Sequence, residues 1–146
     1  MTKVNTIIRG GQVINVQTRS IEQISIGIDN GKIVLDATEA DTYFDVEGAF
    51  IAPGFIDAHM HVESTMLPPT SFAKLTLPHG TTSAIFDPHE IANVLGIAGI
   101  KLIMDDAKNL PFDAFFAASS CVPASPFETS GATLLSDDLE PLFQDE

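Results

Sequence analysis

Hydrophobic and polar positions follow two patterns along the chain, and the change comes near residue 53. In the first part, Ile24, Ile26 and Ile28 alternate with small or polar residues, and Asn30-Gly31 then supplies the pair that a type I′ hairpin turn favours. The segment NTIIRGGQVIN is divided by two glycines, and TYFDVEGAFIAPG predicts a further strand pair around Gly48. We therefore expect residues 1–52 to form a small antiparallel, β-sandwich-type unit.

From residue 53 onward, strand-like and helix-like segments alternate. GFIDAHMH, TTSAIFD and FDAFFAASS are short apolar runs of the kind found in buried strands. Helical spacing follows each of them. It is seen in PPTSFAKLTLPHG, with Thr70 or Ser71 as cap and Phe72 and Leu75 on the apolar face, in IAGIKLIMDDAKNL, and in SDDLEPLFQDE, with Ser136 as cap. This βαβαβα order predicts the α/β fold class, with a parallel sheet and right-handed crossovers.

Three βα units are too few for a closed barrel, which needs eight. A sheet of three parallel strands would also leave a long apolar edge uncovered. We therefore expect residues 53–146 to be the first three βα units of an incomplete, TIM-like (β/α)8 barrel. On this interpretation the sequence is the N-terminal portion of a longer protein.

Composition narrows the classes of partner. The formal net charge is -13, and the seven Lys and Arg residues are scattered, so the sequence argues against a nucleic-acid binder. It has no apolar run of about 18 residues that could span a membrane, and its first residues lack the apolar stretch of a signal peptide. The single cysteine, Cys121, cannot form a disulfide within the chain. We expect a cytoplasmic protein.

The strongest chemical signal is a pair of histidines, His59 and His61, near the end of the first apolar strand. Residues two apart on a strand point to the same side, and α/β folds place their sites at the carboxyl ends of strands. Two imidazoles converging there predict a pair of metal ligands. The competing interpretation is one core histidine and one loop histidine.

Carboxylates flank this pair. Asp57 shares its side of the strand but lies deeper, so it either supports the ligands or has a structural role. Glu63 faces either a substrate or solvent. Both are candidates for substrate contact or for support of the metal ligands.

The segment DPHE follows the second predicted strand and allows two interpretations. In the structural one, Asp87 caps a helix that begins at Pro88, and Glu90 completes a D-x-x-E capping box. In the functional one, Asp87, His89 and Glu90 lie at the same edge of the sheet as the histidine pair, close to substrate or behind the metal ligands.

The remaining candidates are weaker. His79 precedes the second strand, so we expect it in a turn at the opposite edge of the sheet. Cys121 has no base near it in sequence, which argues against a nucleophile, whereas Ser119 and Ser120 could line a pocket. His61-Val62-Glu63 also matches the H-x-E of zinc nucleobase deaminases, but the second half of that metal site, P-C-x-x-C, is absent from the sequence.

PGFIDAHMH behind a small β unit resembles the amidohydrolase superfamily of metal-dependent hydrolases. Three further stretches, HVESTMLPPTSFAKLTLPHGTT, DPHEIANVLGIAGI and SCVPASPFETSGA, narrow the resemblance to the bacterial adenine deaminase family. The resemblance extends over the whole of this sequence. It corresponds to roughly the first quarter of the length of chains in that family.

The resemblance implies a cofactor and a reaction. The cofactor is a pair of divalent metals, manganese or iron, with zinc as an alternative, and His59 and His61 match the first-strand ligands. A metal-bound hydroxide would attack C6 of adenine, giving hypoxanthine and ammonia in purine salvage. The other ligands and the main acid or base are expected beyond residue 146. We therefore expect this sequence alone to be inactive. The resemblance also implies that the intact enzyme is a homo-oligomer.

Two alternatives remain open at this level. The first is another amidohydrolase that acts on a cyclic amide or a different aminopurine. The second is a noncatalytic binding module, although a finished module would be expected to cover the edge of its sheet.

Overall fold

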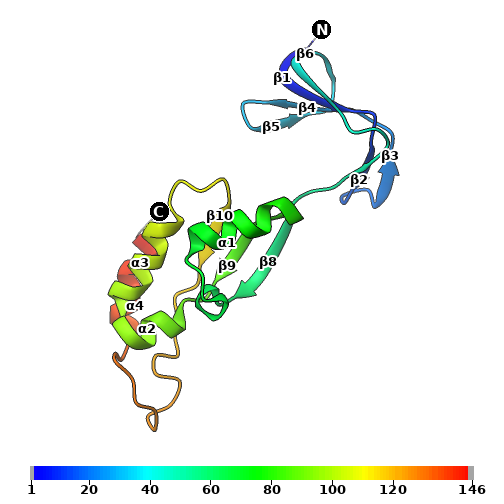
Figure 1. Cartoon of the computed structure of the whole chain (residues 1–146). Helices are drawn as coiled ribbons and strands as arrows, with labels where there is room; N and C mark the ends of the chain where they lie inside the picture. The colour runs from blue at the N-terminus through cyan, green and yellow to red at the C-terminus, as the bar shows by residue number, and fades with distance from the viewer. Residues whose placement is uncertain (1, 145–146) are drawn as a thin grey trace. The chain divides into compact units, whose positions relative to one another are not determined.

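A computed structural model describes residues 2–144 of the chain and separates them into two compact units, one ending at Pro53 and the other starting at Gly54 (Figure 1). The first unit contains strands only, and the second alternates strands with helices. The mixed α/β class predicted from the sequence is confirmed.

The N-terminal unit holds two small sheets. One has the order β5-β4-β1-β6 and the other β3-β2-β7. Val4 and Ile7 of β1 and Ile26 of β4 are buried in the first sheet. The strands are β1 (Thr2–Arg9), β2 (Gln12–Asn15), β3 (Ser20–Glu22), β4 (Ile26–Asp29), β5 (Lys32–Val34), β6 (Ala37–Asp45) and β7 (Phe50–Ile51).

The predicted hairpin is confirmed. β4 and β5 pair antiparallel, with Asp29 opposite Lys32, and the two residues between them, Asn30 and Gly31, have φ angles of 48° and 74°. Both angles lie in the left-handed region that a type I′ turn requires, which Asn and Gly enter more easily than other residues.

The predicted strand pair around Gly48 is wrong. β6 pairs in parallel with β1, and β7 pairs in parallel with β2, so β6 and β7 belong to different sheets. Gly48 donates its N–H to the carbonyl of Gly10, which joins the two bends directly. The bend at Gly48 therefore carries the chain from one sheet to the other alongside β1 and β2, and the unit is not purely antiparallel.

In the C-terminal unit, the described residues form a parallel sheet of order β10-β9-β8, made of β8 (Phe55–Met60), β9 (Thr81–Phe86) and β10 (Asp113–Phe116). The connections carry α1 (Pro69–Thr76), α2 (His89–Leu95) and α3 (Ile97–Ala107), and α4 (Ser136–Leu139) follows β10. Short 3-10 helices occur at η1 (Val62–Thr65), η2 (Leu77–His79) and η3 (Glu140–Gln144). The predicted alternation of strands and helices is confirmed.

Aromatic side chains fill the space between this sheet and its helices. Phe86 is 1% exposed, and its ring centroid lies 5.8 Å from that of Phe72 on α1 and 6.3 Å from that of Phe112. Thr70 at the start of α1 donates its backbone N–H and its hydroxyl to the carboxylate of Asp106 on α3. The two helices are therefore joined by polar contacts as well as by the core.

Three details of the predicted helices are wrong. α1 begins at Pro69, so Thr70 and Ser71 lie inside the helix instead of capping it, and Ser136 is likewise the first residue of α4. Leu75 is exposed, because Pro69, Phe72 and Ala73 form the buried face of α1. Apolar spacing located the helix but not the face that tertiary packing selects.

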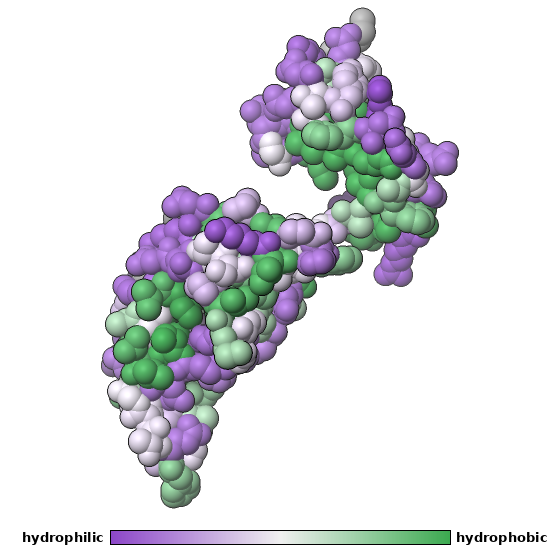
Figure 2. Space-filling view, viewed as in Figure 1, coloured by the Kyte–Doolittle hydropathy of each residue, from purple (hydrophilic) through white to green (hydrophobic). Residues whose placement is uncertain are grey.

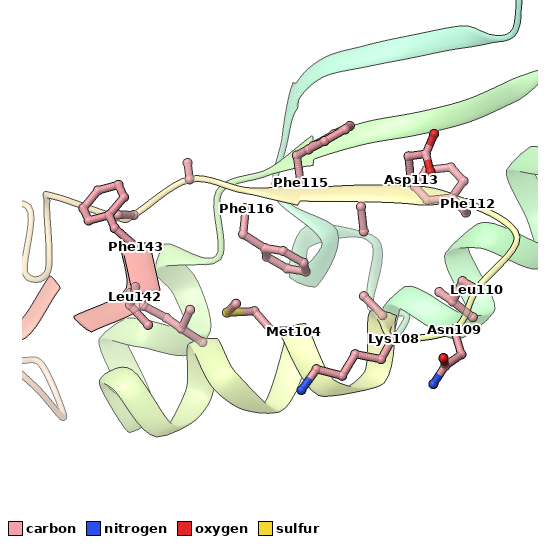
Figure 3. Close-up of a pocket in the computed structure, with 15 residues that line it drawn as sticks. Met104, Lys108, Asn109, Leu110, Phe112, Asp113, Phe115, Phe116, Leu142 and Phe143 are labelled. Atoms are coloured by element: carbon pink, nitrogen blue, oxygen red, sulfur yellow. The ribbon is translucent and has the colours of Figure 1, made fainter. Parts of the chain in front are cut away.

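An apolar groove runs beside β10. It has a volume of about 510 Å³ and lies between β10, α3 and η3 (Figure 3). Phe116 points toward α3 in this view, and Phe115 points to the other face of the strand. Within residues 2–144, no strand pairs with the outer edge of β10.

Hydrophobic side chains also reach the surface of both units (Figure 2). Examples are Ile33 and Leu35 in the first unit and Val94 and Leu102 in the second. None of the helices in the described part of the chain is long and apolar enough to cross a membrane.

The aromatic core predicts unequal effects of two phenylalanine substitutions. Phe86→Ala removes a buried ring and should lower the free energy of unfolding by about 3–5 kcal/mol. Phe115→Ala, on the neighbouring strand but 58% exposed, should lower it by less than about 1 kcal/mol. Urea denaturation of both variants measures the difference, and equal losses would contradict this placement of the core.

Candidate metal centre

The candidate residues come together where the parallel strands end. The hydrogen bonding between strands continues past the strand ends, since Asp87 donates its N–H to the carbonyl of Met60, and Ala117 donates to the carbonyl of Phe86, both at 2.8 Å. These bonds hold the residues that follow β9 and β10 beside the last residues of β8 and β9. Of the predicted candidates, His59, His61, Asp87, His89 and Glu90 meet at this edge.

His59 and His61 point toward each other as their spacing predicts. Their Nε2 atoms are 3.3 Å apart. Two nitrogens that each lie about 2.0–2.1 Å from one ion, at a near-tetrahedral angle, are separated by roughly 3.3–3.4 Å. The pair is therefore spaced as two ligands of one divalent ion would be.

Glu90 fixes the other side of the His61 ring. Its Oε2 lies 2.9 Å from His61 Nδ1, and its Oε1 accepts a hydrogen bond from the hydroxyl of Ser64. A carboxylate can only accept here, so the His61 proton is assigned to Nδ1, and the Nε2 lone pair faces His59. Histidine ligands of metals commonly have this type of carboxylate partner.

The surroundings of Glu90 favour its charged form. Partial burial raises the pKa of Glu90, but hydrogen bonds from its own backbone N–H, from His61 and from Ser64 outweigh that effect. The net result is a pKa below the usual value of a glutamate. Glu90 therefore remains a carboxylate that accepts the His61 proton in a hydrogen bond.

Asp87 does not have the capping role that the structural interpretation of DPHE assigns to it. The N-cap position of α2 is Pro88, without a side-chain capping bond, and Glu90 binds His61 and Ser64 instead of closing a capping box. Asp87 Oδ1 accepts a hydrogen bond of 2.7 Å from the buried hydroxyl of Ser119. The local sequence suggested a cap, but a residue 32 positions away holds this carboxylate.

The side chain of Glu63, and not that of Asp87, accepts a hydrogen bond from the backbone in the first turn of α2. Its Oε1 accepts the backbone N–H of Ile91, in the first turn of α2, at 3.1 Å. A negative charge beside the first N–H groups of a helix is favourable. Its second oxygen, Oε2, is buried without a hydrogen-bond partner among the described residues. Glu63 thus ties the segment after β8 to the helix that carries His89 and Glu90.

The other candidates lie outside this cluster. Asp57 is exposed and accepts the backbone N–H of His59, at 3.3 Å. His79 lies in η2, before β9, at the opposite edge of the sheet. Cys121 is a free, exposed thiol. Ser64 was not predicted from the sequence as part of the site. The only feature of the sequence that could have indicated it is its position three residues after the H-x-H pair.

Two overlapping sets of ligand atoms result. His59, His61 and Asp87 form one set, and His61, His89 and Glu90 form the other, with the atoms of each set within 4.8 Å of one another. His89 Nδ1 is buried without a hydrogen-bond partner in the described residues, 3.6 Å from Asp87 Oδ2. Imidazole nitrogens combined with carboxylates suit zinc, iron and manganese.

Residues 50–144 match the amidohydrolase family. The chain belongs to this family. Curated adenine deaminases from Geobacillus kaustophilus (strain HTA426) and Lactiplantibacillus plantarum are each 47% identical to it over 99% of its length. Another, from Listeria monocytogenes serotype 4b, is 46% identical over 99%.

This amidohydrolase chain spans about a quarter of the length of the curated relatives it matches. Among solved structures, it is similar to an N-acyl-D-glutamate deacylase from Bordetella bronchiseptica, complexed with zinc and a phosphonate inhibitor. That match has 25% identity and a TM-score of 0.46, and it covers 58% of this chain and 19% of the deacylase chain.

Replacing Glu90 in this amidohydrolase tests its contact with His61. Glu90→Gln can place an amide N–H at Nδ1, which favours the wrong tautomer, so divalent metal affinity should fall by about 10–100-fold. Ser64→Ala removes only one hydrogen bond to Glu90 and should have a smaller effect. Nitrogen NMR of the His61 ring should show the proton at Nδ1 in the unaltered chain and a shift of the tautomer in Glu90→Gln. An unchanged tautomer and affinity would contradict the assignment.

Proposed function

We propose that this chain is part of a metal-dependent adenine deaminase, which converts adenine and water to hypoxanthine and ammonia. One observation carries the proposal: relatives named adenine deaminase are 42–47% identical to it over 98–99% of its residues. The cluster of histidines and carboxylates at the end of the sheet supports the same conclusion, because it gives such a reaction a place to occur.

His59 and His61 are the proposed ligands of a divalent metal, manganese or iron, with zinc as an alternative. A pair of such ions supplies a nucleophile at neutral pH and stabilises the negative charge that develops when C6 of adenine is attacked. The contribution of this chain is to orient the ligands. Glu90 holds the proton of His61 on Nδ1, and Ser64 holds Glu90.

His89 is the proposed proton-handling or substrate-contacting side chain in this part of the site. Its ring lies against that of His61, with centroids 4.4 Å apart, and the backbone of its helix is fixed by Glu63. Asp57 is exposed beside His59 and is a further candidate for contact with substrate. The main acid or base would come from another part of the intact enzyme.

We also propose that residues 53–146 are the first three βα units of a (β/α)8 barrel, with residues 1–52 as a separate N-terminal β unit. The parallel order of β8, β9 and β10 supports this, as does the apolar groove beside the unpaired edge of β10. A fourth strand would pair with that edge and cover Phe116 and Leu142 in the groove (Figure 3).

The proposed setting is purine salvage in the cytoplasm, by a homo-oligomeric enzyme that binds neither nucleic acid nor membranes. The net charge of -13 supports the exclusion of nucleic acid, because few cations are present to contact phosphates.

Ammonia release and hypoxanthine formation test the activity in the intact enzyme that contains this chain, reconstituted with Mn²⁺. Adenine should be the preferred substrate in a panel that includes other aminopurines and cyclic amides. His59→Ala and His61→Ala should each lower kcat/KM by at least about 100-fold, more than the loss of a partner that only orients a ligand. His79→Ala, at the opposite edge of the sheet, is the matched control and should change it little.

The outcome that refutes the substrate assignment is turnover of a cyclic amide without turnover of adenine. The 146-residue chain alone, supplied with Mn²⁺, should not deaminate adenine at a substantial rate. Substantial turnover by it would show that no further strands are required.

A further inference from the structure

We propose that Asp87 is a third ligand of the divalent ion, so that this chain by itself forms a two-histidine, one-carboxylate metal site. The inference deepens the proposed metal-dependent function and rests on it for the presence of an ion. It concerns residues that all lie within the chain, and it can therefore be tested without the remainder of the enzyme.

The position of Asp87 is set by the sheet. It follows the last residue of β9, and its backbone N–H bonds to the carbonyl of Met60, the residue between His59 and His61. This hydrogen bond places the two histidines and Asp87 on neighbouring strand ends. One ligand atom from each lies within 4.8 Å of the others, close enough for a single ion.

Among the described residues, the carboxylate of Asp87 has few partners: one hydroxyl within hydrogen-bonding distance, and the ring of His89, which pairs with its charge only when protonated. The side chain of Asp87 is only 17% exposed. Its one hydrogen bond comes from the neutral hydroxyl of Ser119 to Oδ1, and Oδ2 is 3.6 Å from His89 Nδ1, beyond hydrogen-bonding distance. A carboxylate held largely out of water with a single neutral donor is unfavourable, and a bound cation removes that cost.

Ser119 orients this carboxylate. It is 2% exposed, it follows β10, and its hydroxyl lies 2.7 Å from Asp87 Oδ1. A buried hydroxyl that donates to one oxygen of a carboxylate fixes the direction of the other oxygen. This arrangement is typical of the residues that support metal ligands.

The second set of potential ligands, His61, His89 and Glu90, fits an ion less well. His61 Nδ1 and Glu90 Oε2 already bond to each other, and Glu90 Oε1 accepts from Ser64. An ion between them would have to break these contacts. In the first set, the Nε2 atoms of His59 and His61 contact each other at 3.3 Å, so an ion would replace that single contact, and Asp87 Oδ2 accepts no hydrogen bond from the described residues. Glu90 and Ser64 therefore support the site, and Asp87 completes it.

Two histidines with one carboxylate form the ligand set that binds divalent iron in many nonhaem proteins, and it leaves further coordination positions open. The chain alone should therefore bind one equivalent of Mn²⁺ or Co²⁺ with measurable affinity. Two histidines alone would bind the ion more weakly, so the carboxylate of Asp87 should account for the difference in metal affinity.

Titration of the 146-residue chain with Mn²⁺, monitored by the electron paramagnetic resonance signal of the free ion, tests this. The unaltered chain should bind one equivalent. Asp87→Asn keeps an oxygen that accepts from Ser119 but removes the charge, and it should weaken Mn²⁺ binding by at least about 10–100-fold. Asp113→Asn is the control: Asp113 is an exposed carboxylate at the start of β10, and its replacement should leave binding unchanged.

A second experiment gives a positive signal and does not depend on loss of affinity. In a chain with Cys121→Ser, which removes the only native thiol, Asp87→Cys should give a thiolate-to-cobalt charge-transfer band when Co²⁺ is added. Cys121→Ser alone should not. Far-ultraviolet circular dichroism checks that each variant has the fold of the unaltered chain.

Each outcome separates this inference from the proposed function. A chain that binds no ion, or an Asp87→Asn variant that binds as tightly as the unaltered chain with no band in Asp87→Cys, overturns the role of Asp87 even if the intact enzyme deaminates adenine. Loss of Mn²⁺ binding in Asp87→Asn together with the cobalt band supports it, even if the intact enzyme prefers another substrate.

Discussion

The arrangement of the C-terminal unit depends on the hydrogen bonds that β9 makes with β8 on one side and with β10 on the other. Because the three strands run in the same direction, their last residues lie along one edge, and the bonds from Asp87 to Met60 and from Ala117 to Phe86 extend that alignment beyond the strands. Residues that are far apart in the chain, from His59 to Ser119, become neighbours for this reason. The aromatic core around Phe86 holds the sheet against its helices and keeps that edge in register.

At this edge, the polar side chains divide by what they contact. His59, His61 and Asp87 have potential ligand atoms within 4.8 Å of one another. Glu90 contacts the far side of the His61 ring, Ser119 donates to Asp87, and Ser64 donates to Glu90. In the described part of the chain, the Glu63 carboxylate hydrogen-bonds to none of these side chains and instead accepts a hydrogen bond from the backbone of α2. The geometry of this cluster therefore depends on the end of β8 and on the segments that follow β8, β9 and β10. This distribution explains how short, irregular loops can hold a site without a long rigid element inside it.

The sequence was sufficient for features that depend on neighbouring residues. The Asn30-Gly31 turn, the alternation of strands with helices and the convergence of His59 with His61 follow from local periodicity and turn chemistry, and the structure has each of them. Family membership was also foreseen from short motifs, and the match over residues 50–144 confirms it.

Features that depend on distant residues were mispredicted or missed. DPHE has the composition of a helix cap, so nothing local indicates that Ser119 holds Asp87 or that Glu90 bonds to His61. The bend at Gly48 was visible, but the partners of β6 and β7 were not, since both pair with strands more than 30 residues earlier in the chain. The i, i+3 spacing of Phe72 and Leu75 indicated the helix, but Leu75 is exposed, because spacing alone does not reveal which face of a short helix meets the sheet.

Within residues 2–144, no strand pairs with the outer side of β10, and this affects how copies of the chain interact in solution. An open strand edge beside an apolar groove is a template on which identical chains can stack, and like charge is one of the means by which proteins resist such stacking. With a net charge of -13, copies of this chain repel one another at neutral pH. Near the isoelectric point, at about pH 4.4, that repulsion vanishes while the edge and the groove remain. In the chain by itself, like charge therefore opposes self-association at the edge of β10, and moderately acidic or high-salt solutions weaken that opposition.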